Sequence, residues 1–461
     1  MWCSTSLTRK CFARGDHASG ELRVPPPPID SAHDDTYQTL QLTLLVLSRA
    51  LGSRQICRKR QGIEWYPSEP KGLLYNAAHL SSVESKPNFH MQAPTELTLA
   101  YGRGAAPKLV RCIQNAGSSA VGSDESVLRF KAIETSLELM IGAANLACLV
   151  SAGIVPALNL AASKDLDEKI RALAHTALAR LACDRSARES MLASATCETL
   201  VATAVDPAAS VCSACLGVVT QLGTYDDGRK ALIAVHFVEL LLARCRERHD
   251  GGPQTPEVQA AALTGLNRLC QTDDGQAEAI RMSAVPTALM TLASEHPEVR
   301  CQSAWCLALT TYEQTEKAVA LEGGVMPKLV KMLSSEDVEE AAMRQRLRIA
   351  AAAFLMSMCN GARMEEDKPH PKGVAVDAGV CIALLPLVDE AASLHRMGEM
   401  TPEASDLAVY ATKCIAALAD SPKARKQLAK ALPNLRDLTT STELALGKHA
   451  EIAIERITWT P

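Results

Sequence analysis

Apolar residues recur along most of the chain with the spacing of one face of a helix. In the segment GGVMPKLVKML at residues 323–333, Leu329, Val330 and Leu333 occupy positions i, i+1 and i+4, which share a helical face. Similar segments recur, and the leucines that we take as their anchors are Leu109, Leu158, Leu200, Leu240, Leu289, Leu329, Leu384 and Leu435. Successive anchors lie 40 to 55 residues apart, and a period of this order indicates a helical solenoid. The glycine pair of this segment therefore marks a repeat and not a phosphate-binding loop.

Turn-forming residues precede several anchors. Proline stands two residues before three of them, at Pro107, Pro156 and Pro327. The first turn of a helix tolerates the missing N–H group of proline. Glycine precedes these prolines at Gly104, Gly153 and Gly324 and permits a sharp turn between helices. We therefore expect each anchor helix to begin just after a tight turn.

A second apolar helix is predicted after each anchor, as in IRALAHTALARLAC and VRCQSAWCLALTTY. Several of these helices follow a polar residue and a proline, which is a helix start signal: Asp206 and Pro207, Thr255 and Pro256, Thr401 and Pro402. Eight anchors and eight second helices predict an all-α fold. We expect a right-handed superhelical solenoid of the armadillo or HEAT type, with about eight helical repeats, over residues 91–461.

Two regions are expected to contact protein partners. The second helices should line the concave face of the solenoid, which makes that face the first candidate. The other candidates are three insertion loops, where longer repeats carry polar or breaker-rich residues: NAGSSAVGSDES after Gln114, RERHDGGPQTPE after Cys245 and ARMEEDKPHPKG after Gly361. Insertions in solenoids form surface loops that often carry function.

Residues 1–90 lack the repeat pattern. They contain four consecutive prolines, Pro25 to Pro28, and a basic run from Arg58 to Arg60. We expect a disordered or non-native N-terminal extension; the alternative is a polyproline ligand for SH3 or WW domains. The abrupt change at HMQAPTELTLAYG leads to the hypothesis that translation begins at Met91. Abundant peptides from residues 1–90 in the native protein would contradict it.

Composition narrows the classes of partner. The formal net charge of -4 over 461 residues lacks the basic excess of a nucleic-acid-binding protein. The run TLQLTLLVL before Ser48 is about half the roughly 20 residues that a membrane helix needs. The first residues lack the apolar core of a secretory signal, and the sixteen cysteines are spread along the chain, as expected for reduced thiols packed in a core. We therefore expect a cytoplasmic protein that binds neither nucleic acid nor membrane.

Two residue groups have the composition of chemical sites but are better explained by packing. Cys212 and Cys215 have redox or zinc spacing, but neither further ligands at zinc spacing nor a strand-to-helix context accompanies them. On a helix they form an ordinary core pair. His175 lies within an alanine and leucine face and is expected to be a packed residue.

Carboxylate pairs occur at the same place in consecutive repeats, in GTYDDGRK and QTDDGQAE: Asp226, Asp227, Asp273 and Asp274. We expect them in turns, which Asp and Gly favour, and not in a catalytic or calcium site. Nucleotide, nucleophile-elbow and zinc-helix motifs are missing from the sequence. We therefore expect no enzyme activity, no catalytic or metal residues and no cofactor.

The repeats resemble the armadillo family over about 370 of the 461 positions. Importin-type members carry tryptophan followed four residues later by asparagine, which clamps basic peptides. Here Trp305 is followed at that offset by Leu309. Recognition of nuclear signals is therefore not expected from the resemblance.

A closer resemblance is to the radial spoke head protein 14 family. It rests on the segments TLAYGRGAAPKLV, VLRFKAIETSLELM, LVSAGIVPALNLA and AIERITWTP, the last with Trp459. It begins near Met91, runs to the end and implies a structural component of the radial spokes in the axoneme of motile cilia and flagella, without catalytic residues. Two alternatives stay open: a soluble cytoplasmic armadillo adaptor for cargo or client proteins, and a regulatory subunit that binds an enzyme.

Overall fold

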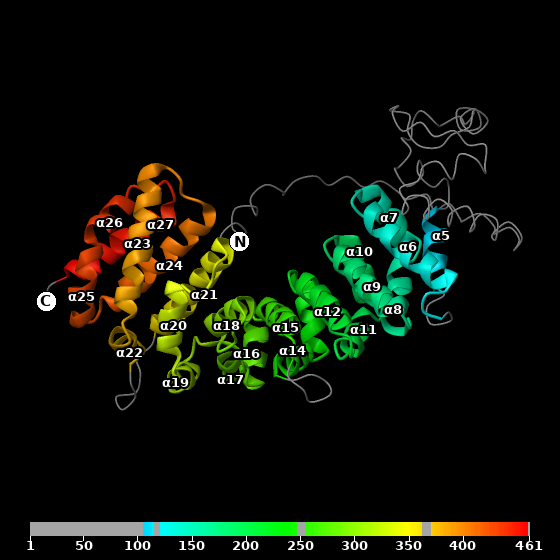
Figure 1. Cartoon of the computed structure of the whole chain (residues 1–461), viewed down its shortest axis with the longest axis horizontal. Coiled ribbons are helices and arrows are strands. Elements are labelled where there is room, and N and C mark those ends of the chain that lie inside the picture. The colour runs from blue at the N-terminus through cyan, green and yellow to red at the C-terminus, as the bar shows by residue number, and fades with distance from the viewer. Residues whose placement is uncertain (1–104, 115–119, 247–253, 362–369, 460–461) are drawn as a thin grey trace, which may run out of the picture.

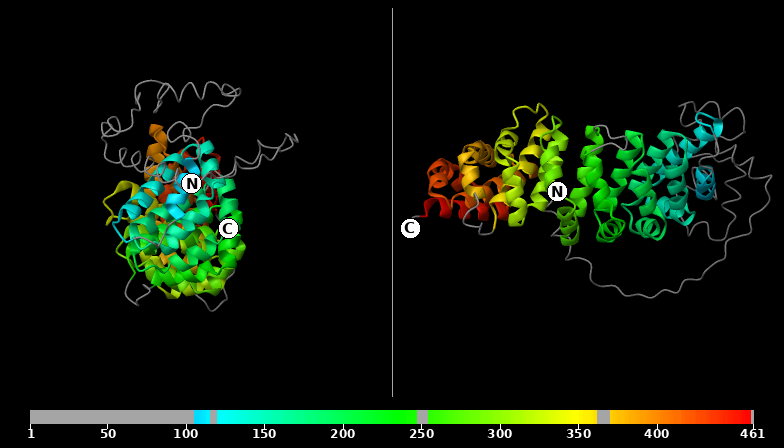
Figure 2. Two further views of the ribbon diagram at one scale, coloured as in Figure 1. Left: turned by 90° about the vertical axis from the view of Figure 1, so that its right-hand side faces the viewer. Right: turned by 90° about the horizontal axis from the view of Figure 1, so that it is seen from below.

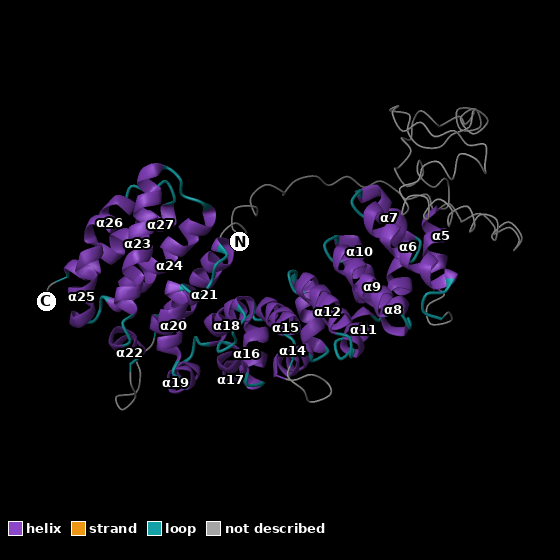
Figure 3. Ribbon diagram, viewed as in Figure 1, coloured by secondary structure: helices purple, strands orange, loops and turns teal. Residues whose placement is uncertain are grey.

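The computed structural model of the chain describes residues 105–114, 120–246, 254–361 and 370–459. The regular structure in these residues is helical throughout, without strands (Figure 3). The helices stack into an arc with two raised arms (Figure 1). From below, the repeats follow one another in a single row (Figure 2). The predicted all-α solenoid is confirmed.

Helices of three kinds alternate along the arc. The anchor helices carry the anchor segments: α5 (Ala105–Gln114), α8 (Ile154–Lys164), α11 (Thr196–Thr203), α14 (Phe237–Arg246), α17 (Ala284–Thr291), α20 (Val325–Ser334), α23 (Val380–Met397) and α26 (Leu432–Leu438). The inner helices follow them: α6 (Asp124–Leu139), α9 (Glu168–Leu181), α12 (Ala209–Leu222), α15 (Pro256–Leu269), α18 (Pro297–Thr310), α21 (Ala341–Cys359), α24 (Pro402–Leu418) and α27 (Leu444–Thr458).

Short helices precede all but the first described anchor helix: α7 (Ala143–Ser151), α10 (Arg185–Ala193), α13 (Asp226–Ala234), α16 (Asp273–Arg281), α19 (Gln314–Glu322), α22 (Pro371–Asp377) and α25 (Pro422–Leu428), with the 3-10 turn η4 (Ala429–Ala431) after α25. The eight predicted repeats are confirmed, but each complete repeat has three helices and not two. Three helices per repeat is the armadillo arrangement.

The inner helices follow the inside of the arc and the anchor helices its outside (Figure 1). Neighbouring inner helices pack directly on each other, as α9 does on α12 and α18 on α21. Leu158, Leu329 and Leu384 are among the anchor leucines that are fully buried. The core formed between the layers is one continuous cluster of aliphatic, alanine, methionine and cysteine side chains, as expected for a stack of repeats.

The anchor positions in α14 and α17 differ from the prediction by one residue. Several anchor helices follow a residue with left-handed backbone, and the anchor leucine lies five residues after it. Examples are Leu158 after Gly153, Leu329 after Gly324 and Leu384 after Gly379. In α14 and α17 the left-handed residues are His236 and Ser283, which place Leu241 and Ala288 at the anchor. In α14, Leu241 is buried, whereas the predicted anchor Leu240 is only partly buried. In α17, the predicted anchor Leu289 is the next residue after the observed anchor, Ala288.

Two of the three predicted polar-proline helix starts are confirmed. Thr255 and Thr401 are N-cap residues with proline in the first turn, and Oγ1 of Thr401 accepts a hydrogen bond from the backbone N–H of Ala404 at 3.2 Å. The start predicted at Asp206 is wrong, because α12 begins at Ala209 with Ala208 as its N-cap. The Asp206 side chain instead accepts the backbone N–H of Ala208 and binds Arg171 of the preceding repeat.

Several sequence predictions lie outside the described residues. They include the extension at residues 1–90, the start of the solenoid between residues 91 and 104, and much of the three insertion loops, at 115–119, 247–253 and 362–369. Within the described ranges, no single helix is long and apolar enough to cross a membrane. Helices α7 and α8 taken together have the length and composition of a membrane span, but they are bent by 74° relative to each other.

Candidate interaction surface

In the first half of the arc, small, uncharged side chains are exposed on three of the inner helices. The unpacked sides of the inner helices carry partly or fully exposed Ala172 and Thr176 of α9, Ser213 and Gly217 of α12, and Thr264 of α15. Helix α12 contains no charged residue. Small side chains of this kind permit close approach of a partner's backbone, and α12 itself provides no charged contact.

Aromatic residues gather on the second half of the inner face. The rings of Trp305 in α18 and Tyr410 in α24 form an edge-to-face pair with centroids 6.2 Å apart and an interplanar angle of 72°. Helix α21 packs against both α18 and α24, and its Ile349 is partly exposed. Nζ of Lys413 lies 5.7 Å from the Tyr410 ring centroid. Large aromatic side chains are the usual anchors of protein interfaces.

The two helical cysteines form the predicted core pair. The thiols of Cys212 and Cys215 donate hydrogen bonds to two different carbonyl oxygens, those of Ala204 at 3.1 Å and Leu200 at 3.4 Å. Burial raises the pKa of Cys212 to about 11 and that of Cys215 to about 12. Both thiols therefore stay protonated. Of the thirteen cysteines in the described residues, Cys183 alone is exposed.

His175 is packed as predicted, without a partner for its ring. The residue is completely buried in α9, and neither Nδ1 nor Nε2 has a hydrogen-bond partner. Burial lowers its pKa to about 4, opposed by the charge of Asp206 and assisted by that of Arg171. The imidazole is therefore neutral near pH 7 and has no access to a substrate.

The carboxylate pairs do not lie in turns, which corrects the sequence prediction. Asp226 and Asp227 form the first turn of α13, and Asp273 and Asp274 form that of α16. Negative charge is stabilised at a helix N-terminus. In the part of the chain that the structure describes, no group of three or more His, Cys, Asp or Glu residues could hold a metal ion.

The glycine after each carboxylate pair has a packing role. A Cβ atom added at Gly228 would lie 2.2 Å from the carbonyl oxygen of Leu222, and one at Gly275 would lie 2.0 Å from that of Leu269. These distances are far below van der Waals contact. The two glycines therefore let α13 and α16 approach the ends of the preceding inner helices.

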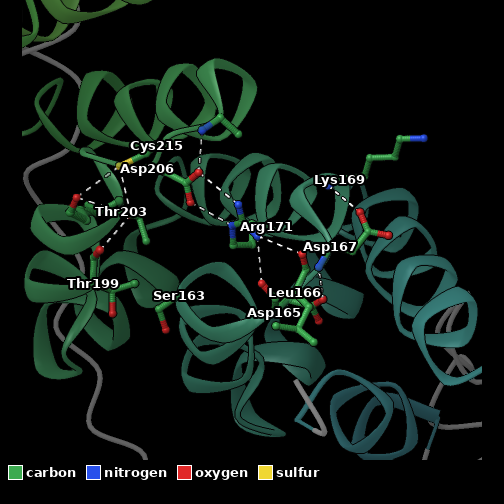
Figure 4. A network of polar contacts seen from close by, with 12 residues as sticks. Ser163, Asp165, Leu166, Asp167, Lys169, Arg171, Thr199, Thr203, Asp206 and Cys215 are labelled. Atoms are coloured by element: carbon green, nitrogen blue, oxygen red, sulfur yellow. Dashed lines mark hydrogen bonds and ion pairs between the residues drawn. The ribbon is translucent and has the colours of Figure 1, made fainter. Parts of the chain in front are cut away.

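Ion pairs join successive repeats at the turns that precede the inner helices. Arg129 pairs with Asp165 at 2.6 Å and Arg300 with Asp337 at 2.8 Å. Arg171 binds Asp206 through two bonds, from Nε at 2.9 Å and Nη2 at 3.1 Å (Figure 4). Each arginine lies on an inner helix and each aspartate in the next such turn. In the sequence, each arginine is followed by its aspartate about 36 residues later. The pattern of apolar positions does not include these residues, so the sequence analysis missed the ion pairs.

A second recurrent contact caps the inner helices. The fourth residue of a short helix donates to the carbonyl oxygen six positions earlier: Arg188 to Ala182 at 3.1 Å, Arg229 to Gly223 at 3.1 Å, Gln276 to Cys270 at 3.0 Å and Arg425 to Ala419 at 3.0 Å. Basic side chains at a helix C-terminus satisfy free carbonyls and offset the helix dipole. In α16 the arginine is replaced by the neutral Gln276.

Comparison with known proteins shows one sequence relative. No family model matches the chain. Radial spoke protein 14 of Chlamydomonas reinhardtii is 25% identical over 262 residues, which covers 47% of this chain and 66% of that protein. The chain thus matches slightly less than two thirds of its relative's length. The predicted resemblance to radial spoke protein 14 is confirmed.

Solved structures support the fold. A crystal structure titled as an engineered protein, target OR497, is 18% identical and covers 94% of this chain and 97% of its own, with a TM-score of 0.57. A designed armadillo repeat protein, YIII(Dq)4CqI, is 17% identical and covers 56% of this chain and 98% of its own, with a TM-score of 0.45. The first likeness supports a helical solenoid, and the second is too distant to add to it.

Proposed function

We propose that this chain is a non-catalytic armadillo-type scaffold of the radial spoke in the axoneme of motile cilia and flagella. The observation that carries the proposal is its similarity to radial spoke protein 14 of Chlamydomonas reinhardtii. The fold supports a structural role, because the described residues form one extended stack of repeats with a continuous core.

The inner face is the proposed contact region for other spoke proteins. An arc of eight repeats offers a long surface on which separate segments of partners bind side by side. Affinity at such a surface comes from a few buried anchors within a larger contact area. Trp305 and Tyr410 are the aromatic residues that could act in this way, and the insertion loops are the proposed additional contacts.

The test is the location of the protein in a flagellated cell. A tagged copy of the full chain should stay with axonemes after extraction with detergent and then with 0.5 M salt, and it should co-sediment with spoke proteins once the spokes are released. A spoke-deficient strain is the matched control, in which the tagged protein should be lost from the axoneme. A diffuse cytoplasmic signal would contradict the proposal and favour the cytoplasmic adaptor or the enzyme-binding subunit.

A further inference from the structure

A buried arginine in the anchor helix α14 has no partner. Three arginines of the described residues are buried: Arg129, Arg188 and Arg244. Arg129 pairs with Asp165, and Arg188 pairs with Asp227. Arg244 is 9% exposed, and its Nε atom is buried without a hydrogen-bond partner. Within the described residues, no ion pair or hydrogen bond involves its side chain.

Arg244 occupies a core position of the repeat. It lies three residues after the anchor Leu241 and therefore on the same side of α14. The equivalent residues of other anchor helices are buried and uncharged: Ala161, Thr203, Thr291, Met332, Leu387 and Leu438. The Oγ1 atom of Thr203 lies 3.4 Å from Sγ of Cys215 in the inner helix of the same repeat. This position therefore faces the inner layer, and in α14 a charged side chain fills it.

The preceding repeat lacks the arginine that forms an ion pair at other junctions. Arg171 and Arg300 are the fourth residues of α9 and α18, and they reach aspartates in the turn after the next anchor helix. The fourth residue of α12 is Cys212, which by this equivalence faces the end of the next anchor helix, α14. Arg244 lies near that end, and its charge opposes the rise that burial causes in the pKa of Cys212. The junction therefore holds a cation of the later repeat, whereas the others hold an aspartate.

The guanidinium group of Arg244 is suited to a carboxylate. Arginine stays charged when it is buried, and a buried charge without a partner destabilises the fold. The other two buried arginines both pair with aspartate, because the planar fork of the group matches two carboxylate oxygens. Of the guanidinium nitrogens of Arg244, only Nε is closed off from solvent. The two Nη groups are therefore the donors that a carboxylate from outside the chain can reach.

We propose that Arg244 binds the carboxylate of an aspartate or glutamate of a protein partner, at the junction of the repeats that contain α12 and α14. The two Nη groups donate to the two carboxylate oxygens. The partner thereby supplies the acidic group that Arg171 and Arg300 find within the chain. This contact is made by an anchor helix and not by the aromatic residues of the inner face. The inference rests on the proposed scaffold function only in taking a protein as the partner.

The test uses the purified full chain and two fluorescein-labelled octapeptides, one of alternating glutamate and glycine and one of alternating glutamine and glycine. Fluorescence polarisation should show saturable binding of the glutamate peptide and no binding of the glutamine peptide. Arg244→Met should weaken binding of the glutamate peptide about tenfold or more, because the loss of one partner from a buried charge pair is costly. Arg244→Lys keeps the charge without the fork and should weaken binding about threefold.

Methionine is chosen because Met332 fills the equivalent position of α20. The variant loses an unpaired charge from the core, so its urea midpoint should equal or exceed that of the unchanged chain. The charge control is Arg180→Met, at an exposed position in the last turn of α9, which should bind the glutamate peptide within about twofold of the unchanged chain. Equal loss in the two methionine variants would show a general charge effect and overturn the proposal, as would no loss in Arg244→Met or equal binding of the glutamine peptide.

A second control tests whether the chain itself supplies the carboxylate. Glu247 and Asp250 follow α14 and lie outside the described residues. The variant Glu247→Gln, Asp250→Asn should bind the glutamate peptide within about twofold of the unchanged chain. Binding about tenfold tighter would show that Arg244 is already paired within the chain and would overturn the proposal. Axonemal location is measured separately, so the scaffold function can fail while this site holds, and the reverse.

Discussion

At the scale of single residues, Gly275 stands at a point where no larger residue fits. Because an added Cβ would lie 2.0 Å from the carbonyl oxygen of Leu269, Gly275→Ala must push α16 away from α15. We expect the free energy of unfolding to fall by about 3 kcal/mol, the upper range for overpacking. Urea denaturation followed by circular dichroism measures it.

The matched control is Gly373→Ala, because Gly373 is also the third residue of a short helix but has no atom within 4 Å of an added Cβ. Here alanine should leave stability unchanged or raise it by up to about 1 kcal/mol through its higher helix propensity. Similar losses at both positions would argue against the close approach of α16.

His175 should make the protein sensitive to mild acid. Its pKa of about 4 in the fold lies below the ordinary 6.5, so the unfolded chain binds the proton more readily. The stability that depends on neutral His175 is complete above pH 6.5 and is lost as the pH falls from 6.5 towards 4. Between pH 7.5 and 5 this loss amounts to about 2 kcal/mol.

The corresponding variant is His175→Leu, which keeps the site apolar. Asp206 and Arg171 are the charged groups that act on the pKa of the imidazole, and both remain in the variant. Thermal or urea unfolding at pH 7.5 and pH 5 should show the variant losing about 2 kcal/mol less than the unchanged chain. An equal pH dependence of the two proteins would show that His175 is not the group that titrates.

At the scale of elements, most of the described junctions between a short helix and an anchor helix contain one left-handed residue. Glycine adopts this backbone without strain, whereas other residues are strained by about 1 kcal/mol. Ser283 has φ 62° and Gly324 has φ 65° at equivalent junctions. We expect Ser283→Gly to raise the free energy of unfolding by about 0.5 kcal/mol or more and Gly324→Ser to lower it by about 1 kcal/mol.

The pair of substitutions isolates backbone conformation, because no atom lies within 4 Å of an added Cβ at Gly324. Both changes are measured by urea denaturation. Changes of the same sign in the two variants would mean that the serine hydroxyl, and not the left-handed backbone, determines stability at these junctions.

The sequence predicted the anchor and inner helices because each buries one long apolar face in every repeat. It missed the short helices because each buries only two or three residues, as α13 does with Gly228 and Leu232, and so carries no apolar stripe of its own. The register error at Leu240 has a similar origin: the prediction used glycine as the mark of the turn, but His236 adopts the left-handed conformation there. Contacts such as that between the Trp305 and Tyr410 rings depend on how three repeats stack in space, and the pattern of apolar positions along the chain gives no information on this stacking.

At the scale of the whole molecule, stability depends on coupling between neighbouring repeats, because each repeat contacts only those beside it. The Arg171 and Asp206 pair is one such coupling, with side chains 16% and 11% exposed. A double-mutant cycle with Arg171→Met and Asp206→Asn should give an interaction energy of about 2 kcal/mol, as for a mostly buried pair with two bonds. Hydrogen exchange should show α9 and α12 losing protection in the single variants. Additive single effects would show that the pair does not couple the repeats.

The burial of the thiols has a practical consequence for locating the protein within a larger particle. A maleimide reacts with accessible thiolates, and the core cysteines such as Cys215 and Cys245 are shielded and keep their protons. After replacement of Cys3, Cys11 and Cys57, which precede the described residues, Cys183 would be the preferred point of attachment. A gold cluster or fluorophore placed there marks the end of α9 in the first half of the arc. Its position relative to a tag at the C-terminus would give the direction in which the solenoid runs through an electron-microscopy map.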